Sequence, residues 1–408
     1  MADRIRLSIL ESPNPSRHES RWVVGSPVAA RWLIDRLPQC RCQMLRPVPI
    51  VLCMLLCFSA ACSSAEPADL EPIRVNADGS GFETAVTHRP FSPLGFNYDH
   101  DRDGRLIEDY WDTEWKSVEQ DFAEMHQLGA NVVRVHLQFG RFMETETTPN
   151  QKALAKLADL IALAEKTELY LDLTGLGCYH KADVPAWYDA LGEEQRWAAQ
   201  SNFWTAIAKT VGESPAVFCY DLMNEPVSPG GKRQDGDWLG PAFGDKHFVQ
   251  VISLDQANRS RPEIALAWTR HLTSAIRKVD TQHLITIGMV DWSLDRPGLT
   301  SGFVPKVIGP ELDFIAVHLY PETGKRTENL DTLKGFQIGK PVVIEEIFPL
   351  KSSPADLGQF LDEAQPAGVI GFYWGQTIEE LTPPKTIGEG VTLEWLRLFE
   401  ARAQRTGP

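Results

Sequence analysis

The 408-residue sequence predicts an α/β fold, a (β/α)8 TIM barrel built as a single domain. From about residue 91 onward, short apolar runs rich in branched and aromatic residues alternate with longer amphipathic stretches, as strands and helices do in parallel βα units. Eight such runs can be counted, and no segment is left that is long enough for a second domain. Residues 91–408 are therefore expected to form the barrel.

The apolar runs and the helical periodicity give the expected positions of the elements. We expect strands at 94–97, 131–137, 169–173, 216–223, 283–288, 314–319, 342–346 and 369–374. Helices are indicated at 115–128, 152–166, 195–211, 262–279, 329–336, 354–364 and 392–402, and one more is poorly marked within 291–310. The loop after the first strand and the insertion after the fourth strand are long, as functional loops often are.

Residues 66–90 precede the barrel and are expected to form a linker and a short hairpin. Ile73–Val75 and residues 81–83 read as two strands, and Asn76-Ala77-Asp78-Gly79-Ser80 between them has the composition of a turn. Such a hairpin could close the bottom of the barrel.

The first 65 residues read as material that is absent from the mature protein. Residues 1–43 show no sustained helical or strand period, so we expect a disordered or mis-assigned N-terminal extension. Residues 44–65 combine a short basic start with an apolar run that ends at Phe58, which is typical of a signal peptide and short for a membrane span. We therefore expect Met44 to be the true start and the protein to be exported.

Two ways of processing this signal peptide remain open. Ser59-Ala60-Ala61-Cys62 resembles a bacterial lipoprotein cleavage box, in which Cys62 would carry the lipid, although Ser59 stands where leucine is usual. Ordinary cleavage after Ala65 is the alternative. The exported protein would accordingly be secreted, periplasmic or lipid-anchored at the cell surface.

The charge and the cysteine content of the chain limit the kinds of binding partner that we expect. Residues 1–65 carry a formal charge of +4 and the remainder −19, which argues against nucleic acid or an anionic membrane surface as a partner. We expect a monomer that meets a membrane only through a lipid at Cys62. Cys178 and Cys219 remain in the body; they could pair if their strands are neighbours, but two buried thiols are favoured, and no CxxC or HExxH spacing indicates a metal.

Two of the expected strands end in acidic residues. The run 216–220 leads into Asp-Leu-Met-Asn-Glu-Pro, so that Glu225 with Asn224 beside it stands at the end of the fourth strand. The run that begins Lys-Pro-Val-Val-Ile ends in Glu345 and Glu346 on the seventh strand. Parallel strands bring both ends to one edge of the sheet, and glycoside hydrolysis needs two facing carboxyl groups of this kind.

These motifs resemble glycoside hydrolase family 5, the cellulase and mannanase family of retaining glycosidases, over roughly residues 91–374. The resemblance implies that Asn-Glu-Pro carries the acid/base, Glu225, and that the Lys-Pro-Val-Val-Ile-x-Glu pattern carries the nucleophile, Glu346 rather than Glu345. It implies a β-linked glucan or mannan type of carbohydrate substrate. The two-glutamate reaction requires neither a metal nor an organic cofactor.

Further polar and aromatic residues gather at the expected strand ends. From the resemblance, Arg134 is expected to keep Glu346 ionised, and His318 and Tyr320 are expected to contact the substrate and the nucleophile. The resemblance also makes Trp374 the residue on which the sugar stacks. The remaining polar and aromatic candidates at these strand ends are Asn97, Tyr98, His136, Thr174, Asn224, Asp291 and Trp292.

The sequence departs from the family pattern at the third strand. It also leaves alternative functions open. The family commonly has a histidine where Thr174 stands, and His180 could reach back to replace it. A carbohydrate-binding barrel without catalysis and a transglycosylase that uses the same residues are the alternative functions. Four tryptophans in loops could serve as stacking platforms, namely Trp111, Trp187, Trp238 and Trp292.

Overall fold

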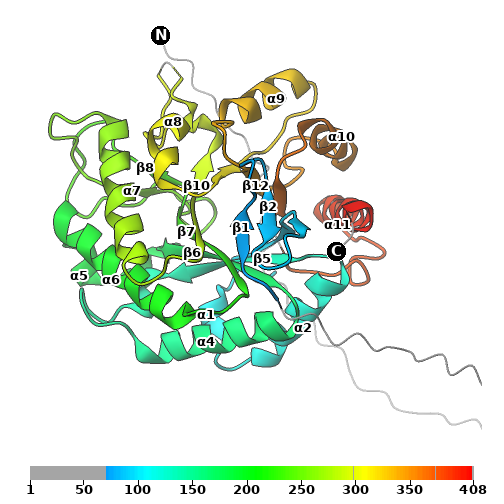
Figure 1. Cartoon of the computed structure of the whole chain (residues 1–408), viewed down its shortest axis with the longest axis horizontal. Helices are drawn as coiled ribbons and strands as arrows, with labels where there is room; N and C mark the ends of the chain where they lie inside the picture. The colour runs from blue at the N-terminus through cyan, green and yellow to red at the C-terminus, as the bar shows by residue number, and fades with distance from the viewer. Residues whose placement is uncertain (1–69, 297, 373, 407–408) are drawn as a thin grey trace, which may run out of the picture. The chain divides into compact units, whose positions relative to one another are not determined.

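The computed structural model describes residues 70–296, 298–372 and 374–406, and these form a closed barrel of eight parallel strands (Figure 1). The strands follow one another around the ring in chain order, and the last pairs with the first. Their bounds are β4 Leu94–Tyr98, β5 Val132–Gln138, β6 Tyr170–Gly177, β7 Val217–Asn224, β10 Leu284–Val290, β11 Ile315–His318, β12 Val342–Ile347 and β13 Gly368–Gly371. The predicted (β/α)8 barrel is confirmed.

Helices surround the barrel as an outer layer (Figure 1). The long ones are α2 Trp115–Gln127, α4 Gln151–Lys166, α6 Glu193–Val211, α7 Arg261–Arg277, α9 Arg326–Gly335, α10 Pro354–Ala364 and α11 Ile387–Thr406. Short turns are α1 Ile107–Tyr110, α3 Phe139–Phe142, η1 Lys181–Asp183, α5 Ala186–Asp189, η2 Asp291–Leu294, α8 Pro305–Ile308 and η3 Gly309–Glu311. The poorly marked helix is thus the single turn α8, followed by η3.

Local sequence signals explain where the helices begin. Asn150 caps α4, because its side-chain oxygen accepts hydrogen bonds from the backbone nitrogens of Lys152 and Ala153. Ser260 and Glu263 form a reciprocal capping box at the start of α7. Each cap satisfies backbone donors that a helix leaves unpaired at its first turn.

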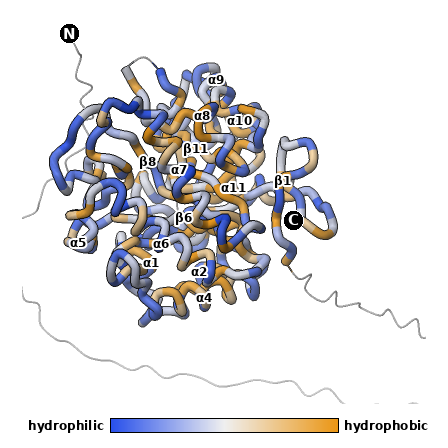
Figure 2. Tube along the Cα trace, turned by 60° about the vertical axis from the view of Figure 1, so that its left-hand side comes forward, coloured by the Kyte–Doolittle hydropathy of each residue, from blue (hydrophilic) through white to orange (hydrophobic). Residues whose placement is uncertain are grey.

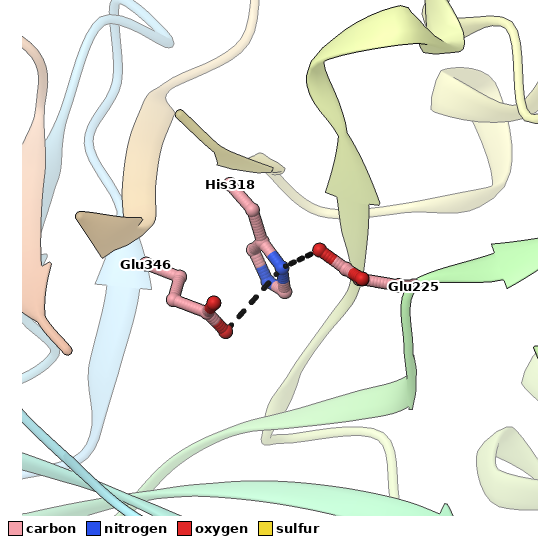
Figure 3. A group of neighbouring side chains, drawn as sticks. All are labelled: Glu225, His318 and Glu346. Carbon is pink, nitrogen blue, oxygen red and sulfur yellow. Dashed lines mark hydrogen bonds and ion pairs between the residues drawn. The ribbon is translucent and has the colours of Figure 1, made fainter. Parts of the chain in front are cut away.

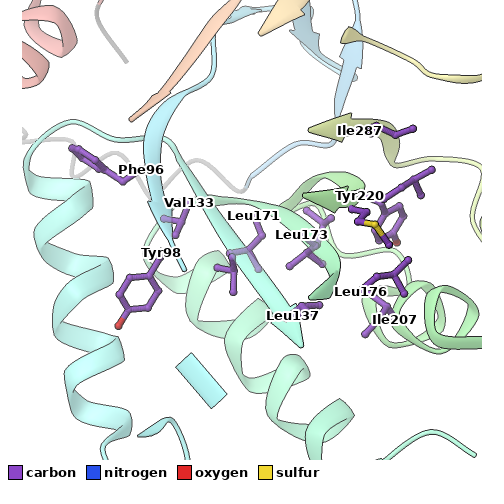
Figure 4. Packing of buried hydrophobic residues seen from close by; sticks show 14 of the residues in the cluster. Phe96, Tyr98, Val133, Leu137, Leu171, Leu173, Leu176, Ile207, Tyr220 and Ile287 are labelled. Carbon is purple, nitrogen blue, oxygen red and sulfur yellow. The ribbon is translucent and has the colours of Figure 1, made fainter. Parts of the chain in front are cut away.

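Strand residues alternate between the helix layer and the barrel interior. Val133, Leu171 and Leu173 pack outward in a continuous apolar cluster (Figure 4). Apolar segments gather along the strands and the inner faces of helices, whereas many outer loops are hydrophilic (Figure 2). Arg134 and Asp172 lie between these apolar residues in sequence, so they point the other way, into the barrel.

The N-terminal end of the barrel is covered by a small antiparallel sheet. It consists of β1 Ile73–Val75, β2 Phe82–Thr84 and β3 Pro90–Phe91, so the expected hairpin is present with a third strand added. The ring of Phe82 packs edge-on against Phe218 and Phe314, which begin β7 and precede β11, with 5.2 Å between ring centroids in each pair. This contact closes the barrel away from the site.

Several expectations from the sequence concern the cysteine thiols and the N-terminal signal peptide. Cys178 and Cys219 are buried free thiols, as favoured from the sequence. The signal peptide, Cys62 and the extension 1–43 lie outside the described residues. Within the described part of the chain, no helix combines the length and the hydrophobicity that crossing a membrane requires.

Candidate active site

Glu225 and Glu346 face each other at the C-terminal mouth of the barrel (Figure 3). One carboxylate oxygen of each and one ring nitrogen of His318 lie within 4.8 Å of one another. The two side chains are 18% and 12% exposed, so both are accessible from the mouth. Glu225 directly follows β7 in the left-handed region, with φ of +48°, and its backbone nitrogen donates to the Gly288 carbonyl at 2.9 Å. A non-glycine residue in this conformation is strained, as is common at functional sites.

His318, the last residue of β11, lies between the two glutamates (Figure 3). Its Nδ1 is 3.0 Å from Oε1 of Glu225 and 3.5 Å from Oε2 of Glu346. Burial alone would lower the pKa of His318, but the charge of Glu346 and the hydrogen bonds to carboxylates outweigh it and raise the pKa to about 10. The ring is therefore cationic at neutral pH, and both of its nitrogens can donate a hydrogen bond.

Arg134 on β5 anchors the side of the site that carries Glu346. Its Nη1 donates to Asn97 Oδ1 at 2.7 Å and to Glu346 Oε2 at 3.4 Å. Its Nη2 donates to Asp221 Oδ2 at 2.7 Å and to Asn224 Oδ1 at 3.0 Å. The guanidinium is fully buried, and these acceptors compensate for its desolvation.

Tyr320 completes the surroundings of Glu346. Its hydroxyl donates to Oε1 of Glu346, while Arg134 approaches Oε2. Burial, assisted by the charge of Glu225, raises the pKa of Glu346 above its usual range, although His318 and Arg134 oppose that rise. Three donors thus favour the ionised form of a carboxyl group that burial would otherwise protonate.

His136 and Asn97 support Arg134 from behind. His136 Nε2 lies 3.1 Å from Asn97 Oδ1, and its Nδ1 meets the hydroxyl of Tyr179. Burial lowers the pKa of His136 well below its usual range, so the ring is neutral. Asn97 Nδ2 donates to the backbone carbonyl of Glu345 at 3.0 Å, which ties β4 to β12 beside Glu346.

The sugar-stacking role that the resemblance implies for Trp374 does not fit the structure. Its indole is 2% exposed and belongs to the core between barrel and helices. Its Nε1 donates to Asp121 on α2 at 3.2 Å, and its ring packs against Phe96 with centroids 5.3 Å apart. Strand β13 already ends at Gly371, so the expected extension to residue 374 was too long and misjudged the direction of this side chain.

His180 does not return to the site. Its Nδ1 is 3.8 Å from Asp245 Oδ2 in the insertion. Thr174 instead donates its hydroxyl to Asp221 Oδ2 at 2.8 Å. The neighbouring Tyr179, for which the sequence contains no obvious signal, reaches His136.

The tryptophans expected as platforms divide into two groups. Trp111 and Trp238 are 3% and 1% exposed and belong to the packed interior. Trp187 packs against Phe139 at 5.8 Å between centroids and is partly buried. Trp292, in the turn after β10, is also partly exposed and stays available as a platform near the mouth.

The structure also brings together buried carboxyl groups that sequence reasoning left without a role. Asp172, Asp221 and Glu345 are each 0% exposed, and all lie beside Arg134 in the barrel interior. Gly288 leaves room for this group, because a Cβ there would lie 2.7 Å from His318 Nε2 and 2.9 Å from Glu345 Oε2. For Asp172 and Asp221 the signal was present, since an acidic residue between two apolar strand residues is expected to point into the barrel.

Comparisons with known proteins agree with this geometry. Residues 84–348 match the family described as cellulase, glycosyl hydrolase family 5. A probable mannan endo-1,4-β-mannosidase C from Aspergillus terreus is 29% identical over 150 residues, which cover 33% of this chain and 32% of that protein. The chain thus matches about a third of this curated relative.

Solved structures share the fold. An exo-β-1,4-mannosidase from Opitutaceae bacterium strain TAV5 has a TM-score of 0.59 at 17% identity, over 81% of this chain and 62% of that one. A GH5_18 protein from Streptomyces cattleya, in complex with Manβ1-4GlcNAc, has a TM-score of 0.57 at 16% identity, over 78% of this chain and 81% of that one. At these identities the likeness is evidence for the barrel alone.

Proposed function

The chain belongs to glycosyl hydrolase family 5, and on that premise we propose that it is a retaining β-glycosidase that cleaves β-1,4-linked mannose. The observation that carries this proposal is the approach of Glu225 and Glu346, whose nearest carboxylate oxygens lie within 4.8 Å. Retaining glycosidases hold their carboxyl groups about 5–5.5 Å apart, whereas inverting enzymes need about 6.5–9.5 Å to admit a water molecule. The short separation favours double displacement.

In the first step Glu346 attacks the anomeric carbon, and the glycosidic bond breaks. Glu225 protonates the departing oxygen, so the leaving sugar departs as a neutral alcohol. Arg134 and Tyr320 hold the two oxygens of Glu346, which orients the carboxylate for attack. The product of this step is a glycosyl ester on Glu346.

In the second step Glu225, now ionised, takes a proton from water, and the resulting hydroxide attacks the same carbon. The ester bond breaks, and Glu346 leaves as a carboxylate. The cationic His318 lies close to both glutamates and stabilises the negative charge that each of them carries in turn during the two steps. The anomeric configuration of the substrate is retained.

Mannose is proposed because both the curated relative and the first solved structure are described as β-1,4-mannosidases. Of the alternatives, a binding barrel without catalysis is disfavoured, because both glutamates keep the donors that a working pair needs. A transglycosylase would use the same first step and a sugar hydroxyl in place of water.

The insertion after β7 supports action at a chain end. It starts with β8 Pro226–Val227, which pairs with β9 Gln250–Val251. Near its end, the Phe248 carbonyl accepts from Asn224 Nδ2 at 3.1 Å, and the His247 nitrogen donates to the Tyr179 carbonyl at 2.8 Å. Lys246 is 6% exposed, and its Nζ would lie 3.2 Å from a Cβ at Gly104.

These contacts carry the insertion from β7 across the end of β6 to the loop after β4. The insertion therefore lies along one side of the barrel mouth, and we propose that it blocks this side to a polysaccharide chain. We propose that the enzyme releases short products from the end of a chain.

The product pattern from mannohexaose tests this proposal. We expect one short product from the earliest times, rapid hydrolysis of an aryl β-mannoside and slow hydrolysis of the matching aryl β-glucoside, measured by chromatography and chromophore release. A ladder of products would contradict end-wise action only. Faster cleavage of the glucoside than of the mannoside would contradict the proposed preference for mannose. If no β-glycoside were cleaved, the proposed hydrolase activity would be wrong.

Gly288→Ala should damage the site without removing any catalytic group. The added methyl would lie 2.7 Å from His318 Nε2 and 2.9 Å from Arg134 Nη2, so both side chains must move. Displacements of this size can cost about 10²-fold in rate, and we expect kcat/KM on the aryl β-mannoside to fall by about that factor. Gly388→Ala is the matched control and should retain activity, because Gly388 is exposed near the start of α11 and a Cβ there would have its nearest neighbour 3.9 Å away. Equal activities of the two variants would show that the site tolerates the displacement.

A further inference from the structure

A second group of charges lies beneath the catalytic pair and takes no part in the steps above. It consists of Asp172 on β6, Asp221 on β7 and Glu345 on β12, gathered around Arg134. Asp221 accepts from Arg134 Nη2, from the Thr174 hydroxyl and from the backbone nitrogen of Gly288, all within 2.8 Å. Three donors satisfy the carboxyl group of Asp221 and favour its ionised form, although burial and the charge of Glu345 raise its pKa.

Glu345 meets the far side of His318. Its Oε2 lies 3.4 Å from His318 Nε2 and 3.6 Å from Arg134 Nη2. The other ring nitrogen, Nδ1, faces Glu225 and Glu346. In the resting enzyme Glu346 is ionised on the Nδ1 side of the ring and Glu345 on the Nε2 side. Ionised carboxylates only accept hydrogen bonds, so the ring needs a proton on each nitrogen.

Asp172 explains how Glu345 can stay ionised in a dry interior. Among the described residues, no N–H or hydroxyl donor meets either oxygen of Asp172 or Oε1 of Glu345. The groups that do lie within hydrogen-bonding reach of Asp172 are the carboxyl group of Glu345 and the thiol of Cys219, which is only a weak donor. The pair of carboxyl groups needs one shared proton. Burial and the charge of Glu345 raise the pKa of Asp172 well above its usual range. Burial also acts to raise the pKa of Glu345, but Arg134 and His318 outweigh it, so the pKa of Glu345 is lowered from its usual value.

We propose that Glu345 is a positioning residue that keeps His318 as an imidazolium between Glu225 and Glu346, with protonated Asp172 donating a hydrogen bond that holds Glu345 in place. The cation then offsets the desolvation of Glu346 and keeps the nucleophile ionised. The catalytic part of this inference rests on the proposed function. The protonation of His318 is a property of the resting protein.

Glu345→Gln keeps the shape of the side chain and removes its charge. The amide can turn its N–H toward His318 Nε2, and the ring is then expected to lose one proton. Without the cation, the pKa of Glu346 rises further, so the acidic limb of kcat/KM should move upward by about one pH unit or more. Activity at low pH should fall more than activity at neutral pH, a pattern that simple loss of stability would not produce.

The decisive readout is the nitrogen NMR signal of the His318 ring at about pH 8, which lies below its pKa of about 10. In the native protein both ring nitrogens should be protonated, whereas Glu345→Gln should show one unprotonated nitrogen. Asp172→Asn should leave the imidazolium signal in place, because the asparagine amide can donate to Glu345 as the protonated acid does.

Asp280→Asn is the matched control. It removes another buried carboxylate that pairs with a histidine, with 2.6 Å between Asp280 Oδ2 and His283 Nδ1, in the loop that leads into β10 at the opposite end of the barrel. It should leave both the His318 signal and the acidic limb unchanged. A neutral His318 in the native protein, or an imidazolium that persists in Glu345→Gln, would overturn the proposal.

These measurements separate this inference from the proposed function. The NMR experiment needs no substrate, so it stands even if no β-mannoside is cleaved. If Glu345→Gln does not fold, titration of the native protein still decides, because a ring that loses its proton near neutral pH would contradict the proposed role of Glu345.

Discussion

Glu346→Ala is expected to lower kcat/KM on an aryl β-mannoside by about 10⁴-fold or more, as the loss of a catalytic nucleophile does. Without the carboxylate no glycosyl ester can form, and the remaining groups bind substrate with little turnover. The small side chain leaves a space beside Arg134 and Tyr320 in which azide can replace the lost nucleophile. Added azide should restore turnover and give the α-mannosyl azide, because it attacks from the face that Glu346 occupied.

The neighbouring glutamate provides a matched comparison. Glu345→Ala removes a carboxylate one residue away, which contacts His318 and Arg134 and does not face the substrate. Azide should not restore that variant. If azide restored Glu345→Ala and not Glu346→Ala, Glu345 would be the nucleophile instead of Glu346. Near-native activity of Glu346→Ala would refute the assignment of Glu346 as the nucleophile.

Glu225→Ala is expected to show an effect that depends on the leaving group. Departure of an alkoxide or a sugar needs the proton from Glu225, so kcat/KM on an oligosaccharide should fall by about 10²- to 10⁴-fold. A dinitrophenyl leaving group needs no proton, so with that substrate the first step should be nearly normal while release of the ester is slow. A burst of dinitrophenol followed by slow turnover is the expected time course.

The same variant has a distinctive response to azide. Azide would attack the glycosyl ester in place of the water that Glu225 normally activates, which accelerates turnover and gives the β-mannosyl azide. The two variants should thus yield opposite anomers. An equal loss of activity on both classes of leaving group would contradict the assignment of Glu225 as the general acid.

Much of the barrel could be predicted because its signals are local. The strands alternate with helices in sequence, and each parallel pair forces a crossover, so the order of the ring follows from the order of the chain. Glu225 and Glu346 could be assigned to one mouth because both end apolar runs. The strand positions of Arg134 and His318 marked them as candidates, and the family resemblance implied their roles; the structure brings both side chains to Glu346.

The predictions that were wrong depended on the position of a strand end and on the path of a loop. Trp374 points outward because β13 ends at Gly371, and strand ends are set by pairing with neighbours that a single run does not reveal. The contact of His180 with Asp245 depends on the path of the insertion, which has no periodicity to read. Asp172 could have been found from its alternation with apolar residues, but Glu345 could not, because Glu346 follows it and the register of β12 shifts at this point. The proposed sharing of a proton between Asp172 and Glu345 depends on the distance between two strands that are far apart in sequence.

The measurement that bears most directly on the paired glutamates is covalent trapping with 2-deoxy-2-fluoro-β-D-mannosyl fluoride. The fluorine at carbon 2 slows both steps, and the activated leaving group lets the first proceed, so the glycosyl ester accumulates. Peptide mass spectrometry of the trapped protein should find the fluorosugar on Glu346. A label on Glu345 or on another side chain, or active enzyme that is never labelled, would contradict double displacement through this pair.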